Sequence, residues 1–101
     1  MVEMDAACIC KALSDSNRLR IVRSLLGGEM CACKLLEQFS ITQPTLSHHM
    51  KVLCECELVR VRREGKWSWY SLNEETLTAF RDFIDGLAGG AAAPQAETER
   101  R

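Results

Sequence analysis

The stretch that decides the fold runs from residue 42 to residue 53 and reads Thr42-Gln-Pro-Thr-Leu-Ser-His-His-Met-Lys-Val-Leu53. Thr42 is a favourable N-cap, and Pro44 falls in the first turn, where its missing N–H leaves no hydrogen bond unmade. The apolar residues recur at i, i+4 and i+7, which places them on one side of a helix: Leu46, Met50 and Leu53. The stretch therefore predicts an amphipathic helix from about residue 43 to residue 56.

The other side of this helix is polar. It carries short polar or basic side chains, which hydrogen-bond base edges and phosphates in DNA complexes: Gln43, Thr45, Ser47, His48 and Lys51. His49 lies close to the apolar stripe, so we interpret it as structural. We predict that the polar side of the helix contacts DNA.

Three shorter helices precede this one. Residues 4–13 are apolar on almost every side, which indicates burial in a core or against a partner. Residues 14–16 supply caps for a second helix that ends at Gly27-Gly28. Residues 30–39 form a third helix, and a turn at residues 40–42 leads into the fourth. A short helix, a tight turn and a capped second helix are typical of a DNA-binding helix-turn-helix.

A basic hairpin follows the helix-turn-helix. Residues 59–63 and 67–72 have the composition of strands, and Glu64-Gly65 supplies the turn between them. Arg62 and Lys66 flank the tip, within reach of phosphates or the minor groove. We expect the aromatic side chains of the second strand to pack on the sheet and not on bases.

A final helix is predicted from residue 74 to residue 87, and residues 88–101 are predicted to be a disordered tail. The fold class is therefore mainly α with a β-hairpin wing, a homodimeric winged helix-turn-helix in the order α-α-α-α-β-β-α. Residues 1–87 form one DNA-binding and dimerisation domain, which suits a chain of 101 residues.

Composition narrows the location and the class of function. Acidic residues occupy the N-terminus where a signal peptide requires basic ones, and no apolar run approaches the roughly 20 residues of a membrane span. We therefore expect a cytoplasmic protein with no membrane partner. No convincing set of nucleophile, base and orienting group occurs, so we do not expect an enzyme. The net charge of −1 leaves the local basic patch as the relevant electrostatic feature.

Six cysteines occur as three Cys-x-Cys pairs: Cys8 and Cys10, Cys31 and Cys33, Cys54 and Cys56. In a reducing compartment such cysteines are metal ligands or redox sensors. The middle pair opens the third helix, where unpaired N–H groups favour thiolate. Residues i and i+2 lie about 200° apart on a helix, so both could bind one ion only if the first turn unwinds. Soft thiolates select As(III), Sb(III), Cd(II), Pb(II), Zn(II) or Cu(I).

Four segments together resemble the ArsR/SmtB family of repressors. They are Leu13-Ser-Asp-Ser-Asn-Arg-Leu-Arg-Ile21, Glu29-Met-Cys-Ala-Cys33, the helix quoted first, and Arg63-Glu-Gly-Lys-Trp67 with Trp69-Tyr-Ser-Leu72. The second is similar to the box of arsenic- and cadmium-sensing members. The resemblance implies a homodimer built from the first and last helices, a palindromic DNA operator, and release of DNA when a ligand binds.

The resemblance also has departures. Leu36 stands where the arsenic box has its third cysteine, so we predict that Cys8 or Cys10, of the same or a partner chain, completes an As(III) site with Cys31 and Cys33. Glu57 stands where the family usually has glycine. The last helix lacks the His that some members use to bind zinc there. Cadmium-sensing relatives carry extra cysteines on an N-terminal extension that we do not expect here, which favours As(III) or Sb(III) as inducer.

The predicted switch is mechanical. Ion capture would distort the third helix, which supports the DNA-reading helix, so the DNA-competent geometry would be lost. Three alternatives remain open: a repressor responsive to Cd(II), Pb(II) or Zn(II), a thiol redox or persulfide sensor, and a cysteine metal buffer with no DNA role. Cys8 and Cys10 also suit small hydrophobic positions in a dimer interface. We favour a buried structural role for Cys54 and have no preference for Cys56.

Overall fold

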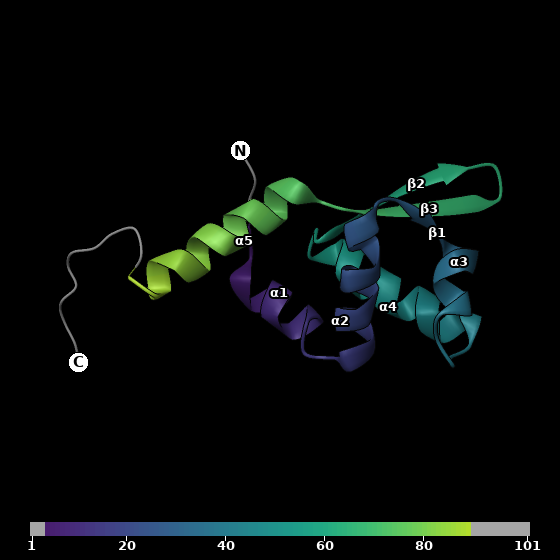
Figure 1. Ribbon diagram of the computed structural model, residues 1–101, viewed down its shortest axis with the longest axis horizontal. Helices are drawn as coiled ribbons and strands as arrows, with labels where there is room; N and C mark the ends of the chain where they lie inside the picture. Colours follow the sequence, from purple (N-terminus) through teal and green to yellow (C-terminus); the bar gives the residue numbers. More distant parts are fainter. Residues whose placement is uncertain (1–3, 90–101) are drawn as a thin grey trace.

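The computed structural model describes residues 4–89, and Figure 1 shows the arrangement of their helices and strands. The elements are α1 (Ala6–Ala12), α2 (Ser16–Ser24), the 3₁₀ helix η1 (Leu25–Gly27), β1 (Met30–Cys31), α3 (Ala32–Glu37), α4 (Gln43–Glu55), β2 (Val59–Glu64), β3 (Trp67–Leu72) and α5 (Glu74–Leu87). The predicted fold class, mainly helical with a β-hairpin wing, is confirmed. Residues 90–101 of the predicted tail lie outside the described residues.

Side chains at the helix starts explain where the main helices begin. Asp5, Asp15, Thr42 and Asn73 each have an extended backbone and accept a hydrogen bond from the backbone N–H three residues later. This bond satisfies one of the N–H groups that a helix start leaves unpaired. The predicted cap at Thr42 and the early Pro44 are both present at the start of α4.

The end of α4 has a Schellman geometry. The Leu58 N–H donates to the Leu53 carbonyl at 3.1 Å, and the Glu57 N–H donates to the Cys54 carbonyl at 3.0 Å. This motif requires a left-handed residue after the helix. Glu57 fills that position with φ 64°, although glycine adopts the conformation at lower cost. The helix end therefore has the left-handed geometry with glutamate at the position where glycine was expected.

The sheet has three antiparallel strands in the order β1-β3-β2. Glu64 pairs with Trp67, so the hairpin turn consists of Gly65 and Lys66, with Gly65 at φ 59°. The predicted turn at Glu64-Gly65 was therefore wrong by one residue, because β2 extends through Glu64. A positive φ at the first turn residue is typical of two-residue hairpin loops.

The start of the third helix also differs from the prediction. Met30 and Cys31 form β1, which pairs with Tyr70 and Trp69 of β3, and α3 begins only at Ala32. Cys31 is the N-cap of α3 and has an extended backbone, with φ −79° and ψ 157°. The first helix is likewise shorter than the predicted residues 4–13.

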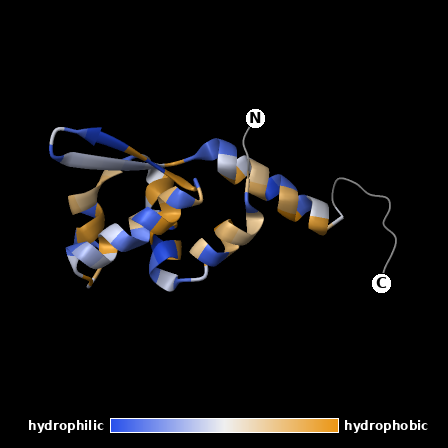
Figure 2. Ribbon diagram, turned by 180° about the vertical axis from the view of Figure 1, so that it is seen from behind, coloured by the Kyte–Doolittle hydropathy of each residue, from blue (hydrophilic) through white to orange (hydrophobic). Residues whose placement is uncertain are grey.

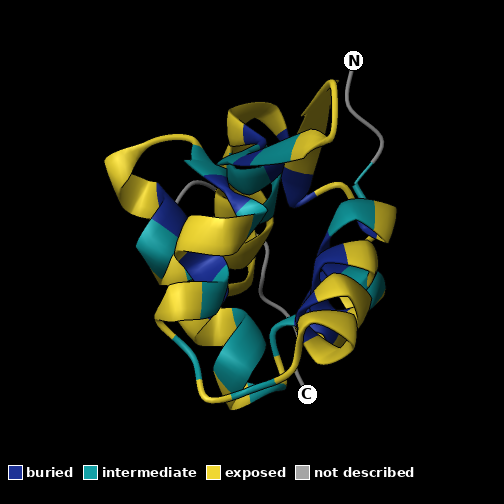
Figure 3. Ribbon diagram, turned by 90° about the vertical axis from the view of Figure 1, so that its right-hand side faces the viewer, coloured by how far each residue is buried: buried dark blue, intermediate teal, exposed yellow. Residues whose placement is uncertain are grey.

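The core lies between the helices and the base of the hairpin. Its fully buried members include Ile9 of α1, Ile21 of α2, Leu35 of α3, and Leu53 of α4. Figure 3 shows buried residues on the inward sides of the helices and exposed residues over most of the outer surface. α5 projects away from this core (Figure 1), and Figure 2 shows apolar residues recurring along it. Its Phe83, Ile84 and Leu87 are exposed in the single chain.

Candidate nucleic-acid interface and thiol pair

The two sides of α4 separate as predicted. Leu46, Met50 and Leu53 are buried. The predicted DNA contacts on this helix are all exposed: Gln43, Thr45, Ser47, His48 and Lys51. A solvent-exposed row of short polar and basic groups on the second helix of a helix-turn-helix has the chemistry that major-groove contact requires.

His49 is structural, as its position beside the apolar stripe predicted. Its ring is buried, and its Nδ1 accepts a hydrogen bond from the Arg18 guanidinium at 3.1 Å. Burial lowers the pKa of His49, and the nearby Asp15 carboxylate opposes this shift only in part. Arg18 also donates to the Ala12 carbonyl at 2.7 Å. A neutral His49 therefore joins α4 to α2 and, through Arg18, to the end of α1.

The two predicted DNA contacts in the wing, Arg62 and Lys66, have different surroundings. Arg62 pairs with the Glu29 carboxylate at 2.8 and 3.1 Å, and with Glu64 at 3.2 Å. These carboxylates raise the pKa of Arg62. Lys66 is exposed in the turn, with its Nζ 5.8 Å from the centre of the Trp67 ring. Lys66 is therefore free of ion pairs within the described residues, whereas Arg62 already has two anionic neighbours.

The aromatic side chains of β3 are only partly packed on the sheet. Tyr70 is buried and Trp69 is half-buried, in agreement with the expectation. Trp67 is 49% exposed at the hairpin tip, which contradicts it. The reason is that the strands extend beyond the helices, so no element covers the ring at this end of the hairpin.

Cys31 and Cys33 have their sulfur atoms 3.1 Å apart. Two sulfurs bound to one ion through bonds of about 2.3 Å lie at most about 4.6 Å apart, so this pair is already close enough to share an ion. The prediction that the first helical turn must unwind was wrong. Because Cys31 is extended and precedes the helix, the opposed directions of helical residues i and i+2 do not apply to it.

The two thiols differ in acidity and exposure. The two thiols share a hydrogen bond, which lowers the pKa of Cys31 and raises the pKa of Cys33. Backbone N–H groups at the start of α3 lower the pKa of Cys31 further. Cys31 is buried and Cys33 is exposed. The pair therefore has one thiol that ionises readily and one that solvent reaches, a combination suited to capture of a soft ion.

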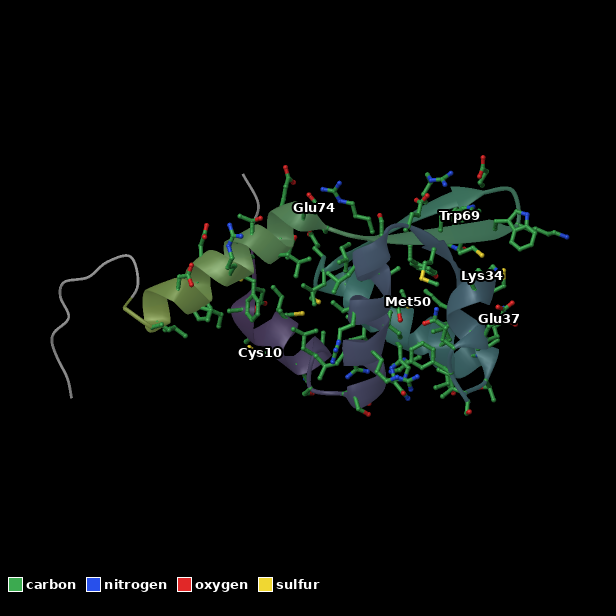
Figure 4. The ribbon with its side chains drawn as sticks, viewed as in Figure 1. Cys10, Lys34, Glu37, Met50, Trp69 and Glu74 are labelled. Carbon is green, nitrogen blue, oxygen red and sulfur yellow. The ribbon has the colours of Figure 1, made fainter. Side chains whose placement is uncertain are left out.

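Cys8 and Cys10 do not join this pair within a single chain, whereas Cys54 lines a cavity together with Cys33. α1, which carries Cys8 and Cys10, and α3 lie at opposite ends of the helical layer (Figure 1), and Figure 4 labels Cys10 far from Lys34 and Glu37 of α3. Across residues 4–89 no group of three His, Cys, Asp or Glu side chains could hold a metal ion. Cys56 is buried and Cys54 only half-buried, and burial raises the pKa of both.

Comparisons with known proteins agree with this geometry. Residues 15–61 match the model of the bacterial regulatory protein arsR family. An arsenical resistance operon repressor of Staphylococcus aureus is 53% identical over 83 residues, covering 82% of this chain and 77% of the relative. The chain belongs to the arsR family. Members of this family are transcription regulators, so this chain is a transcriptional repressor with a winged helix-turn-helix fold and not an enzyme.

Two further comparisons place this arsR-family chain among its relatives. A homologue of the cadmium resistance regulatory protein CadC from Staphylococcus aureus is 40% identical, covering 71% of this chain and 60% of the relative. The crystal structure of a possible transcriptional regulator for arsenical resistance superposes with a TM-score of 0.70 at 28% identity, covering 76% of this chain and 80% of the other. None of the helices within residues 4–89 has both the length and the apolar character needed to cross a membrane.

The site of this arsR-family chain includes one contact that sequence reasoning missed. The ion pair between Glu29 and Arg62 joins the segment just before Cys31 to the wing. Glu29 was visible only as a member of the cysteine box, and Arg62 only as a basic wing residue. A two-residue strand such as β1 leaves no periodic signal, so its pairing with β3, which brings Glu29 beside Arg62, was not predictable from the pattern.

Proposed function

We propose that this chain is a dimeric repressor of an arsenical resistance operon, which leaves its operator when Cys31 and Cys33 capture As(III) or Sb(III). The observation that carries the proposal is the 3.1 Å contact between these two sulfur atoms. The arsenical resistance repressor at 53% identity supports the choice of inducer.

DNA binding would use the exposed side of α4 and the wing. The proposed contacts are Gln43, Thr45, Ser47, His48, Lys51, Arg62 and Lys66. In a two-fold symmetric dimer, the two copies of α4 would enter successive major grooves roughly 34 Å apart. The exposed Phe83, Ile84 and Leu87 on α5 support a second copy of the chain as the partner, because a monomer rarely leaves such residues grouped in solvent.

Release would begin at the wing. α3 packs mainly against β1 and β3, so movement of the thiol segment would reach the hairpin before it reaches α4. Leu35 of α3 shares the core with Leu46 and Met50 of α4, which gives a second route to the DNA-reading helix. The ion shifts the equilibrium only to the extent that it binds the released state more tightly than the DNA-bound state.

The third bond of a pyramidal As(III) requires a further ligand. Cys8 and Cys10 remain the candidates, and their distance from α3 within one chain means that a second copy would have to supply them. A Cd(II)-, Pb(II)- or Zn(II)-responsive repressor is the second candidate function, supported by the relative named for cadmium resistance. A redox sensor is the third, because two sulfurs in contact are also poised for oxidation.

A duplex-binding titration tests these functions together. Fluorescence anisotropy of a labelled operator would be followed as arsenite, antimonite, Cd(II), Pb(II), Zn(II) or hydrogen peroxide is added under otherwise reducing conditions. Release by arsenite and antimonite at the lowest concentrations supports the proposal. Release by peroxide alone, or a chain that binds these ions and shows no salt-dependent affinity for any duplex, contradicts it.

A further inference from the structure

A cavity of about 700 Å³ lies between α3, α4 and the hairpin. Apolar side chains from all three regions line it: Leu36 of α3, Leu46 and Met50 of α4, and Val61 and Tyr70 of the hairpin. Met50, labelled in Figure 4, is buried in the middle of α4. The cavity is thus a mainly apolar space large enough for a small organic group.

One of the two thiols of the pair borders this cavity. Cys33 lines its wall, and so does Leu36 one helical turn further along α3. Leu36 occupies the position where a third thiolate would otherwise complete an inorganic As(III) site. An apolar side chain therefore stands at that position and lines the same cavity as Cys33 and Cys54.

The apolar cavity beside Cys33 and Leu36 favours a carbon substituent as the third group on arsenic. We propose, building on the function proposed above, that the preferred inducer is a monosubstituted trivalent organoarsenical, R–As(OH)₂, whose carbon substituent R occupies this cavity. Cys31 and Cys33 displace the two hydroxyl groups and form two As–S bonds. The two thiol protons leave with the hydroxyls as two water molecules. Arsenic stays trivalent and keeps its As–C bond, so no oxidant and no third thiol are needed.

The position of the cavity also explains release. Four of the proposed DNA contacts, Gln43, Ser47, Lys51 and Lys66, line it as well. A substituent held there stands between the recognition helix and the wing, on the side that would face the duplex. Ligand and DNA then compete for the same surface, and release needs no unwinding of α3.

The first test compares two ligands on the full chain. Arsenite and phenylarsine oxide, which hydrates to the phenyl form of R–As(OH)₂, are titrated into the complex with an operator duplex. We expect phenylarsine oxide to release half of the duplex at a concentration on the order of tenfold lower, because the ring becomes buried against apolar side chains. Because Cys54 also lines this cavity, the control is a chain with Cys8→Ser, Cys10→Ser and Cys54→Ser, which should show the same preference since no third thiol takes part.

Variants then separate the cavity from the thiols. Val61→Trp fills the cavity from β2, and Arg60→Trp adds the same ring at the neighbouring position, which does not line it. Adduct formation is measured by mass spectrometry in competition with dithiothreitol, so that altered DNA affinity does not affect the result. We expect Val61→Trp to weaken capture of the phenyl ligand roughly tenfold relative to Arg60→Trp, and to leave capture of arsenite unchanged.

A third thiol should reverse the preference. Leu36→Cys supplies it, and Leu36→Ser is the matched control without sulfur. We expect Leu36→Cys, and not Leu36→Ser, to lower the arsenite concentration needed for release of DNA. If wild-type chain responds to arsenite at or below the concentration of phenylarsine oxide, or if Val61→Trp and Arg60→Trp behave alike, the organoarsenical inference is overturned while the proposed function stands. If neither ligand releases DNA, both are overturned.

Discussion

Cys8-Ile9-Cys10 and Cys31-Ala32-Cys33 have the same spacing of cysteines but different backbone conformations. Both members of the first pair lie inside α1, where Cys8 faces inward and Cys10 is exposed. In the second pair Cys31 is extended and pairs with β3, and only Cys33 is helical. The difference shows that the backbone conformation of the first cysteine, and not the spacing, decides whether two sulfurs can share an ion.

The largest expected effect is the loss of the inducer response. In a chain with Cys31→Ser and Cys33→Ser, we expect arsenite to release no DNA, because the two sulfurs that lie 3.1 Å apart are gone. The matched chain with Cys8→Ser and Cys10→Ser should still respond, more weakly if a second copy supplies the third ligand. Anisotropy titration of both chains measures this. A full response without Cys31 and Cys33 would show that another pair is the sensor.

The next effect is on thiol acidity. Cys33→Ala removes the hydrogen bond that most strongly lowers the pKa of Cys31, so the pKa of Cys31 should rise. Since thiolate is the reactive form, Cys31 should then need a higher pH for alkylation by iodoacetamide. Peptide mapping of alkylation against pH measures this, with Cys10→Ala as the control. An unchanged profile would mean that the helix start alone sets the acidity of Cys31.

The third pair, Cys54 and Cys56, lies where α4 ends. The effect of the left-handed residue at this helix end on stability can be tested. Glu57→Gly should stabilise the fold by about 1 kcal/mol, because glycine adopts the left-handed conformation without the Cβ clash. Glu55→Gly, two residues earlier and still helical, should destabilise it by about 1 kcal/mol. Urea unfolding of the two variants provides the comparison. The same sign for both would contradict the Schellman end seen at Glu57.

Sequence reasoning succeeded where periodicity and capping both act. The limits of α4 were predicted closely because apolar spacing and the cap at Thr42 agree, and those of α5 followed from apolar spacing. The exposed side of α4 followed from the same spacing. The hairpin turn was misplaced by one residue, since a glycine marks a turn without showing which of its neighbours shares that turn.

Contacts between distant residues were not predictable in the same way. β1 exists only because Met30 and Cys31 meet β3, about forty residues later in the chain. Arg18 was visible in the sequence only as part of the first segment that resembles the repressor family, yet it joins Ala12 and His49. The assignment of Cys31 to a helix failed for the same reason, because tertiary pairing overrode the local pattern.

The smallest expected effect concerns the ion pair between Glu29 and Arg62, which links the segment before Cys31 to the wing. The cysteine pair in α1 has no such link to the wing. Glu29→Gln removes the carboxylate that holds Arg62, and Glu64→Gln removes the other one. Either change leaves Arg62 with one carboxylate neighbour instead of two and makes it more available to a phosphate, so operator affinity should rise up to a few-fold and the salt dependence should steepen by at most about one charge. Only Glu29→Gln should also alter the arsenite concentration for release, because Glu29 is two residues from Cys31 while Glu64 lies at the hairpin tip. Weaker DNA binding in both variants would mean that Arg62 supports the wing through its ion pairs and does not contact DNA.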